Sequence, residues 1–304
     1  MSKSNSVLRP HSADYFGEER DYLWNQDYLD LLASRLALSS ITSLADIGCG
    51  VGHWSALLYP RLSAGTELIG VDADPDNLAG FRRRFSGQPG APVRALQANA
   101  GALPLPNEAF DATTCQTLLI HLEDPGKAVK EMVRITRPGG LIICAEPNNL
   151  FGRFPTAWSA EHMSVERLTR LTEMAWRYTR GRRLRGLGRD HFGELLPGLL
   201  AKLGLENIRV WLCDRTALMI PPYDSAAQQA FIRSYERWRA GGTGPFDRED
   251  MRANVLAGGG TDDFFDAAWA DYLADDFSTV EAMRDARWSS AGGTLLYFVV
   301  GQRR

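Results

Sequence analysis

Short apolar segments alternate with helical segments over the first half of the chain. Apolar runs at 43–48, 67–72, 93–100, 111–120 and 141–146 predict five strands. The segments 22–38, 53–62, 75–85 and 125–135 predict helices before and between these strands. Strands that alternate with helices of about ten residues are typical of a parallel sheet. The strands lack regular polar alternation, which favours a sheet covered on both faces.

The regular alternation stops near residue 150. Residues 150–206 are predicted to form a helical insertion, 207–215 a further core strand, 216–292 a second helical insertion that caps the site, and 293–304 the last core strand. Residues 41–149 form the core in this scheme. We therefore expect an α/β fold with a doubly wound, mostly parallel, seven-stranded sheet and helical cap insertions.

A glycine-rich segment follows the first predicted strand and precedes a helix. It reads Asp46-Ile-Gly48-Cys49-Gly50-Val-Gly52. Glycines permit a tight turn with positive φ and let a ligand lie against bare backbone. The helix that follows presents free N–H groups to an anionic part of the ligand. An acid two residues before the first glycine suits a ligand that carries an ammonium group.

The spacing of these glycines separates this segment from other nucleotide sites. A dinucleotide fingerprint requires G-x-G-x-x-G, and the sixth position counted from Gly48 is His53. No segment ends in the GK[ST] pattern of a phosphate-binding loop. Asp72 ends the second predicted strand, where an acid can meet ribose hydroxyls.

Five motifs in unbroken order resemble class I S-adenosylmethionine-dependent methyltransferases. They are DIGCGVG, GVD, ALPLP followed by FD, LIHLEDP and RPGGLII, within residues 44–146. The resemblance implies a Rossmann-like fold and S-adenosyl-L-methionine as cofactor. Asp46, Gly48, Gly50 and Gly52, with Cys49 as a small residue between them, would surround its methionine portion.

The resemblance also assigns the other cofactor contacts. Asp72 would accept the ribose hydroxyls with Ala73 beside the adenine, and Asn99-Ala100 would cover the adenine edge, where the family usually has aspartate at position 99. Gln116 would approach the methyl-bearing sulfonium. Family members close this region with an N-terminal segment, so residues 1–40 are expected to form a helical lid, with Tyr15, Arg20 and Trp24 as its candidate contacts.

Three titratable residues are candidate bases for the methyl acceptor. His121 and Glu146 lie beyond the carboxyl ends of predicted strands, where doubly wound sheets bind ligands. His191 lies in a loop of the first insertion. A base helps where the acceptor must lose a proton. A structural role for His121 is the favoured alternative, because the family often carries histidine there whatever the substrate.

Charge and cysteine content limit the classes of partner and the cellular compartment that we expect. The chain has 34 basic and 37 acidic residues, a net charge of -3, whereas proteins that bind nucleic acid through bulk charge are basic. Six arginines between Arg177 and Arg189 suggest an anionic ligand, but the acidic residues of 262–276 offer partners for them. The four cysteines lack disulfide or zinc spacing, which is typical of a reducing compartment. The first residues lack the apolar region of a signal peptide, so we expect no secretory leader, and no apolar run has the length that crosses a bilayer.

These observations predict a cytoplasmic methyltransferase that acts on an oxygen or nitrogen of a small organic molecule. We expect no metal, no nucleic acid and no membrane among its partners, and no oligomeric state is predicted. Three alternatives stay open: methylation of a peptide or RNA, a nucleotide-binding oxidoreductase, and a cofactor-binding regulator without catalysis.

Overall fold

A seven-stranded sheet forms the centre of the molecule. The computed structural model describes residues 20, 22–87, 93–150, 156–240, 247–293 and 295–304. The strand order is β3-β2-β1-β4-β5-β9-β6. In chain order these strands are β1 (Ser43–Ile47), β2 (Glu67–Asp72), β3 (Val93–Gln97), β4 (Phe110–Gln116), β5 (Thr136–Asn148), β6 (Glu206–Leu212) and β9 (Leu295–Gln302). Only β9 runs antiparallel to its sheet neighbours in the described chain, which confirms the predicted fold class.

Helices cover both faces of this sheet. Consecutive residues of a strand point to opposite faces, so Leu44 packs with one helical layer and Ala45 with the other. The first layer holds α2 (Gln26–Arg35), α3 (His53–Leu58) and α4 (Pro75–Phe85). The second layer holds α5 (Pro125–Ile135) and α8 (Leu196–Lys202).

The helices that follow β2 and precede β5 begin at matching signals. The side chain of Asp74, which precedes α4, accepts a hydrogen bond from the N–H of Asp76. The side chain of Asp124, which precedes α5, accepts one from the N–H of Lys127. Proline occupies the first turn of both helices, where its missing N–H costs nothing. These caps explain why the sequence predicts both helices with the bounds that the structure has.

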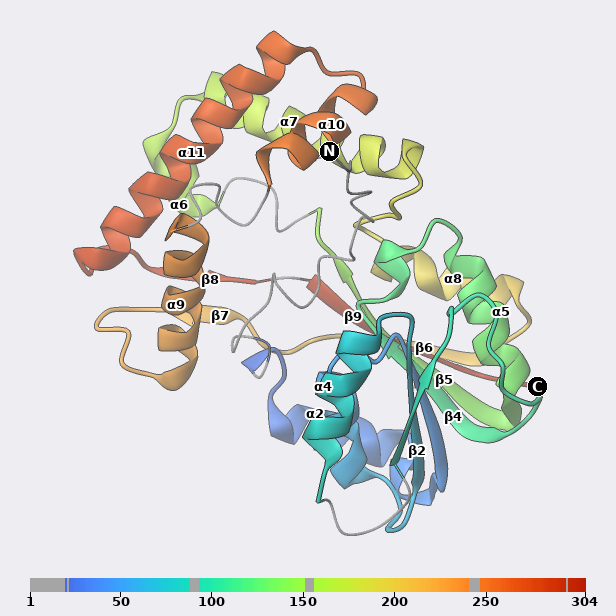
Figure 1. The fold of residues 1–304 in the computed structure, drawn as a ribbon. Helices are drawn as coiled ribbons and strands as arrows, with labels where there is room; N and C mark the ends of the chain where they lie inside the picture. The colour runs from blue at the N-terminus through green and yellow to red at the C-terminus, as the bar shows by residue number, and fades with distance from the viewer. Residues whose placement is uncertain (1–19, 21, 88–92, 151–155, 241–246, 294) are drawn as a thin grey trace, which may run out of the picture.

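The remaining helices form a second body, which we call the cap (Figure 1). Its helices are α6 (Ala157–His162), α7 (Val165–Leu184), α9 (Ala226–Ala240), α10 (Arg248–Ala257) and α11 (Asp262–Arg284). Leu171, Val255 and Phe265 belong to a core shared by α7, α10 and α11. The two insertions therefore pack together rather than separately. A short ribbon of β7 (Ala217–Met219) and β8 (Ser290–Gly292) leads into the cap, and the sequence did not predict it.

Two segment boundaries differ from the prediction. Residues 150–206 were expected to form one insertion, yet Leu196 and Leu200 of α8 are fully buried against the sheet, so the cap part of this segment ends before α8. Residues 1–40 were expected to form a lid, yet Leu29 and Leu32 of α2 are buried in the core of the sheet. Apolar periodicity identifies a buried helix but not the body that buries it.

None of the helices in the described residues is both long enough and apolar enough to span a membrane.

Candidate active site

The glycine loop connects β1 to α3 at the carboxyl edge of the sheet. Gly48 and Gly50 have φ of +68° and +52°, in the left-handed region that favours glycine. The backbone N–H groups of Gly48 and Cys49 both donate to the carbonyl of Val71 in β2. A Cβ on Gly48 would lie 2.6 Å from Leu118, whereas one on Gly50 would have no neighbour within 4 Å. The loop is thus packed beneath Gly48 and open above Gly50.

Asp72 ties the end of β2 to this loop. One carboxylate oxygen accepts the N–H of Gly50 at 2.9 Å, and the other accepts Asp74 N at 2.9 Å and Asn77 Nδ2 at 3.2 Å. A carboxylate has about four lone-pair sites, so it can accept further donors such as ribose hydroxyls. Asp72 is half-buried and lies beside the open side of the loop.

Asp46 is fully buried beneath the loop. Its Oδ2 accepts a short hydrogen bond from Ser55 of α3, and its Oδ1 has no partner among the described residues. Burial raises the pKa of Asp46 to about 7, against the Ser55 hydrogen bond, which favours the ionised form. A buried acceptor without a donor is costly. The position therefore suits a ligand that brings a donor, and an ammonium group fits this requirement.

The predicted adenine contacts lie next to Asp72. The N–H of Ala98 donates to the carbonyl of Asp72 at 3.0 Å, and Gln97 Nε2 donates to the carbonyl of Ala73 at 3.1 Å. Asn99 accepts the N–H of Gly101 through Oδ1 at 2.8 Å, which orders the turn that contains Ala100. The ends of β1, β2 and β3 thus bring the predicted cofactor residues together.

Beyond β4 the chain makes a short helical turn, η4 (Leu119–His121), which a buried glutamate holds in place. Glu146 Oε1 accepts the N–H groups of Leu118 at 2.8 Å and Leu119 at 2.9 Å, and Oε2 accepts that of Ile120 at 3.3 Å. Burial raises the pKa of Glu146 to about 7 in spite of these donors. Since Glu146 is fully buried and both of its oxygens are engaged, its geometry favours positioning of η4 over a direct contact with substrate.

Two predicted bases lie on segments that contact each other at this edge although they are far apart in sequence. His121 ends η4, and Gln116 lies half-buried at the end of β4 just before it. The segment that carries His191 crosses η4, because the N–H of Arg189 donates to the carbonyl of Ile120 at 3.0 Å. The Nδ1 atom of His191 is buried and has no hydrogen-bond partner in the described part of the chain.

The N-terminal contacts are only partly described. Tyr15 lies outside the described residues, and Arg20 accepts the N–H of Leu23 through its carbonyl at 3.2 Å. Trp24 does not belong to a lid: it is 2% exposed, and its ring centroid lies 5.4 Å from that of Trp54 in the core. An aromatic residue predicted to cover the ligand instead supports the sheet.

Three of the six arginines of the run form ion pairs within the chain. Arg177 pairs with Glu173 at 2.5 Å, Arg182 with Asp190 at 3.1 Å, and Arg185 with Asp250 at 3.4 Å. The acidic residues of α11 pair instead with other arginines of the cap: Asp271 with Arg167 and Arg170, Asp266 with Arg248, and Asp262 with Arg252. The predicted pairing of acids and arginines occurs, but with different partners.

Two contacts of the site were not predicted from the sequence. Ser55 binds Asp46 from the next helix, and Leu118 packs against Gly48 from the loop after β4. Both depend on the approach of separate elements, for which the local sequence offers no sign. Within the described ranges, no three His, Cys, Asp or Glu side chains are grouped so that they could hold a metal ion.

Comparison with known proteins agrees with this geometry. Residues 45–144 match the family profile described as methyltransferase domain. A demethylmenaquinone methyltransferase of Thermus thermophilus is 33% identical over 136 residues, which are 43% of this chain and 59% of the relative. A protein of the same description from Shouchella clausii is 28% identical over 123 residues, 40% of this chain and 51% of the relative. The chain thus spans just over half the length of these relatives.

A solved structure extends the likeness of the fold. A Bacillus halodurans protein described as a methyltransferase superposes with a TM-score of 0.50 at 16% identity, covering 92% of this chain and 98% of that protein. At this identity the match concerns the fold alone. Motif order, strand order and the family match together show that residues 45–144 form a class I S-adenosylmethionine-dependent methyltransferase domain.

Proposed function

We propose that this chain transfers a methyl group from S-adenosylmethionine to an oxygen or nitrogen of a small organic molecule. The observation that carries the proposal is the convergence of Asp46, the glycine loop, Asp72 and Asn99 at one edge of the sheet. Each group suits one part of this cofactor. The unpartnered oxygen of Asp46 suits the ammonium group, Asp72 suits the ribose hydroxyls, and Asn99 suits the adenine.

The cofactor, when bound, supplies an activated methyl group on a sulfonium. The protein then has to align an acceptor lone pair with that methyl and remove a proton where the acceptor carries one. In our proposal Gln116 borders the methyl group, and His191, on the segment that crosses η4, takes the proton. His121 shapes the same edge, and Glu146 holds the turn that places it.

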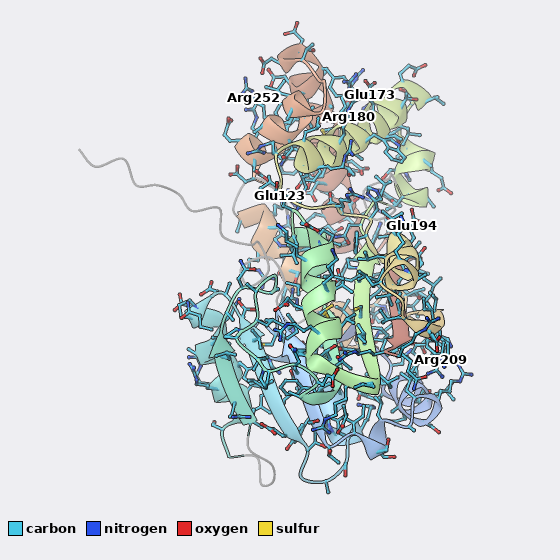
Figure 2. All side chains as sticks on the ribbon, turned by 90° about the vertical axis from the view of Figure 1, so that its right-hand side faces the viewer. Glu123, Glu173, Arg180, Glu194, Arg209 and Arg252 are labelled. Atoms are coloured by element: carbon cyan, nitrogen blue, oxygen red, sulfur yellow. The ribbon has the colours of Figure 1, made fainter. Side chains whose placement is uncertain are left out.

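Two observations support a small acceptor. The relatives named demethylmenaquinone methyltransferase have a name that indicates a small-molecule substrate. Two arginines of the run, which were candidates for binding RNA phosphates, have partners within the chain. Arg182 forms a buried ion pair with Asp190, and Arg185 contacts Asp250 and Asn254 of α10. The cap stands above the sheet, and Glu123 and Glu194 lie at the boundary of the two bodies (Figure 2). We propose that the cap selects the acceptor.

Calorimetric titration is the first test. We expect S-adenosylmethionine to bind with a stoichiometry of one and NAD not to bind, since the glycine spacing differs from the dinucleotide pattern. Tighter binding of NAD, or no binding of S-adenosylmethionine, would refute the proposal. A second assay follows transfer of labelled methyl from S-adenosylmethionine to a demethylated naphthoquinol, a phenol, a primary amine, an unstructured peptide and RNA. Label on RNA or peptide alone would contradict a small acceptor.

A further inference from the structure

A buried ion pair anchors the segment 186–192, which we call the link, to the end of α7. Arg182 Nη1 lies 3.1 Å from Asp190 Oδ1, and the two side chains are 10% and 1% exposed. Arg182 also donates to the carbonyl of Leu187, and Thr179 Oγ1 contacts Asp190 Oδ2 at 3.5 Å. The two buried charges are paired with each other, and the hydrogen bonds to Leu187 and from Thr179 reinforce the pair, so the link is anchored to the end of α7.

The other side of the link lies against the candidate active site. Arg189 N donates to the carbonyl of Ile120, and the carbonyl of Asp190 accepts Asn149 N at 2.8 Å, just beyond β5. Gly188 has φ of +90°, and a Cβ there would collide with the carbonyl oxygen of Ile120. The backbone of the link therefore rests directly on η4, the turn that ends at His121.

The same turn is held from below by the sheet. Glu146 accepts the N–H groups of Leu118, Leu119 and Ile120, while the link binds the carbonyl of Ile120 from the opposite side. The turn is thus clamped between β5 and the end of α7. His191 belongs to the link itself, so the clamp fixes both histidines of this edge.

We propose that Arg182 and Asp190 are positioning residues, which hold the link on η4 so that His121 and His191 keep the geometry needed for methyl transfer. This inference rests on the proposed function. The link contacts the edge after β4 and β5, whereas the proposed cofactor residues other than Gln116 lie after β1, β2 and β3. Loss of the pair should therefore disturb the histidines and leave binding of S-adenosylmethionine nearly unchanged.

The histidine C2–H signals of the full chain, followed by NMR, test this proposal without a known acceptor. The chain has 5 histidines, and His121→Gln and His191→Gln assign the two signals of interest. The double variant Arg182→Met/Asp190→Asn removes both charges together, which avoids a lone buried charge. Arg185→Met is the matched control, since Arg185 leaves the same helix end but its side chain contacts Asp250 and Asn254 of α10.

We expect the double variant to shift both histidine signals and Arg185→Met to shift neither. Amides 118–120 should exchange about tenfold faster in the double variant, as for the loss of one net hydrogen bond, with affinity for S-adenosylmethionine changed less than about twofold. A folded double variant with an unchanged His121 signal overturns the proposal.

A second variant keeps the test decisive if the double variant does not fold. Gly188→Ala leaves the ion pair in place but pushes the link away from Ile120, so it too should shift the His121 signal. An unchanged signal in Gly188→Ala equally overturns the proposal. If wild type does not bind S-adenosylmethionine, the proposed function fails, while the NMR comparison still shows whether the link positions His121.

Discussion

At the residue scale, three carboxylates near one edge of the sheet have three different environments. Asp72 is half-buried and accepts several donors, Glu146 is fully buried and saturated by backbone N–H groups, and Asp46 is fully buried with one oxygen unpartnered. These differences follow from position: Asp72 ends a strand, whereas Asp46 and Glu146 lie within strands covered on both faces. A carboxylate can therefore be placed to accept donors from a ligand, to hold a turn through backbone N–H groups, or to keep one oxygen without a donor.

The buried Asp46 makes stability depend on pH. Its pKa rises from an ordinary 3.8 to about 7 on folding, so between these values the folded state binds the extra proton and the free energy of unfolding falls as pH rises. The fall is at most about 4 kcal/mol for this group, and it should level off above about pH 7. Glu146 adds a slope of the same sign.

Asp46→Asn should reduce this slope while keeping an acceptor for Ser55. Urea unfolding at about pH 5 and about pH 8 measures the change in the free energy of unfolding between these pH values. The pH dependence that remains in the variant is due in part to Glu146. The prediction is wrong if wild type and variant lose the same free energy of unfolding between the two pH values.

Asp46→Asn should also bind S-adenosylmethionine more weakly than wild type above about pH 7, where wild-type Asp46 is ionised and can pair with an ammonium group.

Asp72→Ala should lower the affinity for S-adenosylmethionine by about 10- to 100-fold, as for the loss of hydrogen bonds to a charged group. His121→Ala should leave this affinity intact, because His121 lies after β4. Calorimetry checks both. Asp74→Ala is the control for folding, since Asp74 caps α4 two residues further on. Normal binding by Asp72→Ala would show that the ribose site lies elsewhere.

At the scale of elements, local patterns were sufficient for the sheet and insufficient for the cap. A cap aspartate followed by proline marks α4 and α5, and continuous apolar runs mark β1 and β2. By contrast β7 and β8 have three residues each, too few for a pattern. The contact between the link, which carries His191, and the turn that ends at His121 joins distant segments. The sequence therefore offered both residues as candidates without predicting that their segments meet.

The crossing of α7 and α10 leaves no room for a side chain at Gly181. A Cβ at this position would collide with the carbonyl of Asn254, so Gly181→Ala should destabilise the cap by about 1 to 3 kcal/mol. Gly198 in α8 is the matched control, because a Cβ there has no neighbour within 4 Å, and Gly198→Ala should be neutral or stabilise by about 0.5 to 1 kcal/mol. Chemical denaturation measures both, and equal effects would contradict the close crossing.

At the scale of the whole molecule, the sheet and the cap have separate hydrophobic cores. Two apolar clusters flank the sheet, a third joins α7, α10 and α11, and a fourth joins α9 to the end of α11 and the β7–β8 ribbon. Distinct cores allow distinct opening reactions. The link and the ribbon are two connections between these bodies, so in our proposal the cap responds to an acceptor while the sheet retains the cofactor.

Hydrogen exchange should reveal this division. Saturating S-adenosylmethionine at about 100 times its Kd stabilises the state that binds it by about 2.7 kcal/mol. We expect added protection in peptides covering 44–52, 67–77 and 97–101, and little change in 262–275 of α11, remote from the link. Equal gains in both regions would indicate a single cooperative unit.

The β7–β8 ribbon has a consequence for how such a protein can diversify. Leu212 at the end of β6 pairs with Tyr297 in β9, so the second insertion leaves and re-enters the sheet at neighbouring strands, and β7 and β8 hold its two ends together. Chain ends that lie close together tolerate replacement of what they enclose. Because residues 220–289 share a core with α7, they form an exchangeable cassette together with α6 and α7. Grafting the corresponding segments of a relative onto this sheet should change the acceptor without rebuilding the cofactor site.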